Sequence, residues 1–147
     1  MGFFERIMRY AREFKEEAGV SDQKVEEAAA QSPCERALLV ELAELVDTGL
    51  DGTTVRYTLH FSGEVQFVGF RWTNKELAED RGLTGWVHNE DDGTVTMEIQ
   101  GRPAAIGAHL GMVHAYYSQY GNLIWLETAE RRPPVTDEQG FTVVDLY

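Results

Sequence analysis

Cysteine is nearly absent from this chain, which has Cys34 alone among its 147 residues. One cysteine excludes an internal disulfide and any metal site built from several cysteines. A single free thiol agrees with a reducing cytoplasm, where we expect the protein to be located. The sequence also has no apolar run near the roughly 18 residues that a membrane-spanning helix needs. We therefore expect no association with a membrane.

Basic residues are scarce, with 13 lysines and arginines against 25 acidic residues and a net charge of −12. Nucleic acid and anionic membrane surfaces are poor partners for such a surface, because the mean field repels them. We therefore expect no nucleic-acid partner. A small anionic ligand would have to bind in a local positive pocket.

Apolar residues are plentiful, at 43% of the chain, so a hydrophobic core is expected. Residues 1–50 are predicted to form an all-helical extension of about three amphipathic helices. The first covers about residues 3–18, and the second begins after Ser21 and ends near residue 31. The third begins at the capping box Ser32-Pro33-Cys34-Glu35 and ends at Gly49.

The first of these helices is too apolar to remain exposed. Its apolar residues are Phe3, Phe4, Ile7, Met8, Tyr10 and Phe14. The extension could cover an exposed sheet face, form a homodimer contact, or bind another partner. We expect these residues to dock on their own domain or on a second copy of the chain.

Residues 53–147 alternate strand and helix signals and are predicted to form a second domain. Strands are expected at 55–62, 83–89, 94–100, 123–129 and 141–146, with helices at about 70–81 and 103–120. Asp91-Asp92-Gly93 is expected to be a tight hairpin turn. The order βαββαβ predicts an α+β fold, a ferredoxin-like antiparallel sheet with two helices on one face.

The segment between the first strand and the first helix of this domain, Gly63 to Arg71, carries the strongest functional signal. Two glycines bracket a short loop, and an arginine falls in the first helical turn. Backbone N–H groups at a helix N-terminus, together with one guanidinium, form an anion site without a metal. The alternatives are an ordinary connection and an Arg71 side chain paired with a nearby carboxylate.

Two motifs at matching spacing resemble the acylphosphatase family. They are Gly-x-Val-Gln-x-Val-Gly-Phe-Arg at 63–71 and Gly-Trp-Val-His-Asn at 85–89, followed by Asp-Gly-Thr-Val at 92–95. The resemblance covers about residues 53–147, and its C-terminal strand ending in Tyr147 is also similar. It does not cover the helical extension.

The resemblance implies hydrolysis of an acyl phosphate to a carboxylate and inorganic phosphate. Arg71 would grip the phosphate, and Asn89 would position the attacking water, although turn chemistry alone could account for Asn89. The phosphate-binding loop amides would be those of Glu64, Val65, Gln66, Phe67, Val68 and Gly69. The resemblance implies no metal, no other cofactor and no covalent enzyme intermediate.

The chemistry is plausible from the residues themselves. Phosphoryl transfer is largely positioning and charge stabilisation, and a planar guanidinium can contact two phosphoryl oxygens at once. Residues 54–147 contain no cysteine, and their only serines are Ser62 and Ser118. A serine or cysteine hydrolase is therefore difficult to build there.

Phe67 departs from the family, which usually has glycine at this position. If the backbone there needs a positive φ, phenylalanine strains the loop. Its ring could also cover the pocket or bind the acyl part of a substrate. The alternative function is therefore a non-catalytic binding or interaction module with impaired turnover.

The remaining candidates favour structural roles. His109 and His114 are five residues apart, which is not the spacing that places two metal ligands on one helix face. We therefore predict no metal site. Trp72, Trp86 and Trp125 are expected to be packing residues.

Overall fold

The computed structural model describes residues 2, 5–6, 9 and 19–144. The predicted first helix over 3–18 therefore lies essentially outside the described residues, as do the last residues of the predicted C-terminal strand. Within the described part of the chain, no helix is long and apolar enough to cross a membrane.

A five-stranded sheet with the order β4-β1-β3-β2-β5 forms one layer of the molecule. The strands are β1 (Val55–Gly63), β2 (Thr84–Asn89), β3 (Val95–Gly101), β4 (Ile124–Arg132) and β5 (Phe141–Val144). The first four pair antiparallel, as expected for the ferredoxin-like order.

The fifth strand makes the sheet mixed, because β5 pairs with β2 in parallel. Strand β4 runs antiparallel to β1 and therefore also opposite to β2. The chain crosses from the end of β4 to the other edge of the sheet through residues 133–140. It consequently enters β5 at the end where β2 begins, and the two strands run in the same direction. The sequence prediction of a wholly antiparallel sheet missed this edge pairing.

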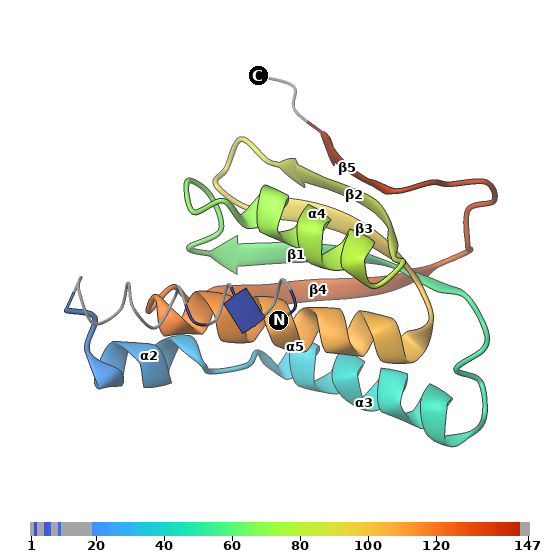
Figure 1. The fold of residues 1–147 in the computed structure, drawn as a ribbon, viewed down its shortest axis with the longest axis horizontal. Helices are drawn as coiled ribbons and strands as arrows, with labels where there is room; N and C mark the ends of the chain where they lie inside the picture. Colours follow the sequence, from blue (N-terminus) through green and yellow to red (C-terminus); the bar gives the residue numbers. More distant parts are fainter. Residues whose placement is uncertain (1, 3–4, 7–8, 10–18, 145–147) are drawn as a thin grey trace.

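Helices α4 (Phe70–Asp80) and α5 (Pro103–Gln119) cover one face of the sheet (Figure 1). Leu59 of β1 and Met97 and Ile99 of β3 are fully buried beneath these helices. The buried face of α5 carries Ile106, Leu110, Val113 and Tyr117.

Helices α2 (Asp22–Ala28) and α3 (Pro33–Asp47) continue the helical layer on the outer side of α5 (Figure 1). Helix α2 ends about three residues earlier than predicted. Helix α3 packs on α5 and on β4, and its Leu38 and Leu42 belong to the same core as the sheet. The described part of the extension thus docks on its own domain, and it does not cover the opposite face of the sheet.

The start of α3 is joined to the domain by buried polar contacts. The Ser32 hydroxyl accepts from Glu35 N–H at 2.9 Å, as the capping box predicts, and donates to the Leu126 carbonyl of β4 at 2.6 Å. The Glu35 carboxylate does not return to the helix N-terminus. It lies 3.2 Å from Nδ1 of His114 on α5, and both side chains are buried.

Candidate active site

The loop between β1 and α4 is held in place at its two glycines. Gly63 has φ 90°, and a Cβ there would lie 2.4 Å from the Leu123 carbonyl oxygen, so only glycine fits. The next N–H, that of Glu64, donates to the same oxygen at 2.7 Å. Gly69 has φ 74° and is the N-cap residue of α4. These two left-handed positions turn the chain from the end of β1 into α4.

Several backbone N–H groups of this loop are available to bind a ligand. Within the described residues, the N–H groups of residues 65–69 have no hydrogen-bond acceptor. Gly69 supplies no side-chain cap, and the first N–H to return to it is that of Thr73, at 3.0 Å. The N–H groups of Phe70 and Trp72, in the first turn of α4, therefore receive no side-chain acceptor from the cap residue. The combination of loop amides and helix N-terminus produces positive potential.

Two side chains hold the loop in shape, and the sequence analysis missed both roles. Gln66 Nε2 donates to the carbonyls of Glu90 and Thr94, at 2.8 and 2.9 Å, and so ties the loop to the β2–β3 turn. The buried Tyr117 hydroxyl donates to the Val68 carbonyl at 3.1 Å. Glutamine in the loop motif was a visible signal for the first contact, but no local signal marked Tyr117, which lies on the buried face of α5.

The position of α4 depends on a buried polar pair. Asn74 Nδ2 donates to the Phe70 carbonyl at 2.8 Å, and Asn74 Oδ1 lies 2.9 Å from His109 Nε2 on α5. Burial, with a smaller effect of the Arg81 charge, lowers the pKa of His109 to about 3. His109 is therefore neutral at physiological pH and donates its Nε2 proton to Asn74. The contact joins the two helices just behind the loop.

Arg71 and Asn89, far apart in the sequence, line the same cavity of about 220 Å³. The other lining residues are Val65, Phe67, Gly69, Phe70 and Trp72. Arg71 Nη1 lies 3.5 Å from the carbonyl oxygen of Val144, a long contact at the end of β5. Asn89 Oδ1 is buried, and it has no hydrogen-bond partner among the described residues. The cavity thus combines a guanidinium, unpaired amide donors and one unpaired acceptor.

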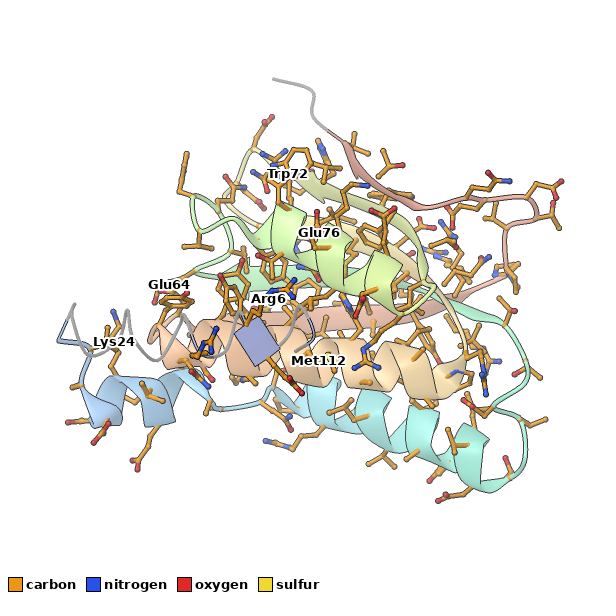
Figure 2. The ribbon with its side chains drawn as sticks, viewed as in Figure 1. Arg6, Lys24, Glu64, Trp72, Glu76 and Met112 are labelled. Atoms are coloured by element: carbon orange, nitrogen blue, oxygen red, sulfur yellow. The ribbon has the colours of Figure 1, made fainter. Side chains whose placement is uncertain are left out.

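Two aromatic residues that line this cavity are exposed to solvent. Phe67 has φ 63°, which confirms the left-handed backbone that its departure from glycine suggested. Its ring is fully exposed, at 102% of the reference area, so it does not fill the cradle. Trp72, in the first turn of α4 (Figure 2), is 57% exposed and is not the packing residue that we expected.

The family model described as acylphosphatase matches residues 57–143, more than half of the chain. The chain belongs to the acylphosphatase family. The matched segment contains the whole cavity and most of the sheet. Residues 1–56, with α2 and α3, lie outside it.

The acylphosphatase relatives differ in how much of them is matched. The chain is 39% identical to the acylphosphatase of Pediococcus pentosaceus over 85 residues, 58% of this chain and 92% of that one. It is 51% identical to the acylphosphatase of Geobacillus kaustophilus over 53 residues, 36% of this chain and 56% of that one. In that second case the chain spans about half of the relative.

The acylphosphatase fold also appears among solved structures. The crystal structure of acylphosphatase from Bacillus subtilis superposes with a TM-score of 0.51 at 25% identity. The match covers 62% of this chain and 99% of that one. The ferredoxin-like architecture predicted from the sequence is therefore confirmed, with the helical extension placed before it.

Proposed function

We propose that this protein hydrolyses acyl phosphates to a carboxylate and inorganic phosphate in the cavity between β2 and the start of α4. One observation carries the proposal. Arg71, Asn89 and a loop with unpaired N–H donors line a single small cavity. The names of the relatives support the same reaction.

In this proposal, Arg71 and the N–H groups of Val65, Gln66, Phe67, Val68 and Gly69 bind the phosphoryl group. The guanidinium offers two parallel donors, and amides that are already oriented need no reorganisation during the reaction. Glu64 was predicted as a further donor. Its N–H already donates to the Leu123 carbonyl, so we leave it out of the proposed set.

Asn89 is proposed to aim the nucleophile, because its buried Oδ1 can accept a hydrogen bond from the attacking water. The water oxygen forms a bond to phosphorus while the bond from phosphorus to the bridging oxygen breaks. The electron pair of that bond leaves with the carboxylate, and the proton of the water passes to solvent. The proposal requires no metal, no other cofactor and no covalent intermediate, because the carboxylate is a good leaving group and the task is positioning.

Turnover of acetyl phosphate by the purified chain, compared with Arg71→Ala and Arg71→Lys, tests this function. Loss of the guanidinium should lower kcat/KM by about 10²–10³-fold, as for removal of a donor to developing charge. Lysine should recover only part of the rate, because it cannot bind two oxygens in one plane. Asn89→Ala should lower kcat while inorganic phosphate still binds.

The rival function is a binding or interaction module that keeps the family fold without efficient turnover. The strained, exposed Phe67 is the observation that favours it. A wild-type rate no higher than that of Arg71→Ala, with inorganic phosphate still bound, would support the module and reject the hydrolase.

The division into an extension at 1–50 and a domain at 53–147, a cytoplasmic location and a homodimer through the N-terminal helices stay predictions. Val40, Val46 and Leu50 are exposed apolar residues in or just after α3, a surface that a second copy could cover. Analytical ultracentrifugation of the full chain tests the dimer. A monomer at high micromolar concentration would reject it.

A further inference from the structure

We propose that Phe67 and Trp72 form an aromatic acyl subsite, so that the preferred substrates are acyl phosphates with a flat, apolar acyl group. The inference rests on the proposed function, since it specifies which acyl group the same cavity accepts. It concerns two side chains that the hydrolysis proposal does not use.

Phe67 and Trp72 are placed where the acyl group of a bound substrate would lie. Both residues line the cavity that also contains Arg71 and Asn89. The carbonyl carbon of an acyl phosphate is only two bonds from phosphorus. An acyl group whose phosphate is bound by Arg71 must therefore lie within or at the mouth of this cavity, and Phe67 and Trp72 are the exposed large hydrophobic residues of its lining.

Both rings are also exposed to solvent in the absence of a ligand. Phe67 is completely exposed and Trp72 is 57% exposed, whereas Phe61, Phe70 and Tyr117, whose rings contact one another behind the loop, are buried. Phe67 also adopts a left-handed φ that disfavours any side chain with a Cβ. Among residues 19–144, which the structure describes, no packing of the fully exposed Phe67 ring compensates for this backbone conformation. A bound apolar group would shield both rings from water.

The chemistry of the site favours an aromatic partner over a charged one. Aromatic rings interact favourably with one another in stacked or edge-to-face geometry. A carboxylate-bearing acyl group would be repelled, because the chain carries a net charge of −12 and Arg71, the cationic side chain that lines the cavity, would be engaged by the phosphate. The subsite thus selects benzoyl-like over acetyl or dicarboxylic acyl groups.

The test is the ratio of kcat/KM for benzoyl phosphate to that for acetyl phosphate. Both substrates have the same phosphate, so effects of a substitution on phosphate binding cancel within the ratio. Phe67→Ala and Trp72→Ala should each lower the ratio by about three- to tenfold, the effect of losing one aromatic contact. Val40→Ala on α3, which removes an equally exposed apolar side chain away from the cavity, should leave it unchanged. A ratio that is the same in the wild type and in both cavity variants would overturn the subsite.

Binding separates a failure of the subsite from a failure of the hydrolase. The affinities of benzoylphosphonate and acetylphosphonate, measured by calorimetry, report selectivity without turnover. Tighter binding of the benzoyl compound that is lost in Phe67→Ala and Trp72→Ala supports the subsite even if no acyl phosphate is hydrolysed. Equal binding of the two compounds overturns the subsite even if hydrolysis is rapid. Both variants remove exposed side chains, and thermal unfolding checks that they remain folded.

Discussion

Replacing Phe67 with glycine should stabilise the protein and accelerate hydrolysis of a small acyl phosphate. The backbone at this position has φ 63°, and a left-handed conformation costs a residue with a Cβ roughly 1–2 kcal/mol. The ring is fully exposed, so its removal forfeits no buried area. Part of this stabilisation is offset, because glycine loses more backbone entropy on folding, which costs about 0.5–1 kcal/mol relative to alanine. The net expected stabilisation is about 0.5–1 kcal/mol.

Alanine at the same position is the matched control. Phe67→Ala also removes the ring but keeps the Cβ and therefore the strain. The free energy of unfolding, measured in urea, should be higher for the glycine variant than for the alanine variant by about 1 kcal/mol, with a Tm difference of roughly 3 °C. Equal stability of the two variants would mean that residue 67 is not left-handed in solution, and the reasoning would fail.

The rate follows from the same strain, because the loop amides are the proposed phosphate donors. If relaxing the loop improves their alignment by about 1 kcal/mol in the transition state, kcat for acetyl phosphate rises about fivefold. The alanine variant should show little of this increase. An unchanged or lower rate in the glycine variant would show that the loop of the natural sequence is already well aligned.

Three further outcomes test the packing around the site. Gln66→Ala should lower the free energy of unfolding by about 1–2 kcal/mol, because the carbonyls of Glu90 and Thr94 each lose one of two donors, and should also lower kcat for acetyl phosphate; urea unfolding and a rate assay measure the two effects. Leu42→Ala should lower the free energy of unfolding by about 2–5 kcal/mol, measured in urea, because this side chain of α3 is buried in the shared core. Unaltered stability would show that the extension is not docked in solution. His109 has a folded pKa of about 3 against an ordinary value of 6.5, so the unfolded chain binds more protons between these values and stability should fall as the pH drops from 6.5 toward 3. His109→Gln should flatten that dependence in unfolding measured at pH 7 and pH 4.5, and an unchanged slope would contradict a neutral buried imidazole.

Local chemistry predicted most of the elements. Strand β1 was visible because Val55, Tyr57, Leu59 and Phe61 alternate with polar residues, and these four are indeed buried. Helix α3 was visible from its capping box. The end of β4 was missed. Its last residues are polar and exposed, but they continue to pair with β1 as far as Arg132, and backbone pairing at a sheet edge does not require apolar side chains.

Part of the candidate site could likewise be predicted from the sequence, and part could not. The loop and Arg71 could be predicted because they are contiguous and follow a known pattern of glycine, amide and cation. The support from Tyr117 and the His109–Asn74 contact could not, since each joins residues more than 30 positions apart through buried side chains. Nor could the exposure of Trp72 be predicted, because a tryptophan in a helix is more often buried than exposed.

The sequence alone determined the order of strands and helices and the family, because periodicity, turn residues and motif spacing are local properties. Only the tertiary structure decided that β5 runs parallel to β2, that α3 shares the core of the domain, and that Trp72 is exposed at the cavity of Arg71 and Asn89. Those outcomes depend on which surfaces bury one another, and burial is settled by contacts between segments that are distant along the chain.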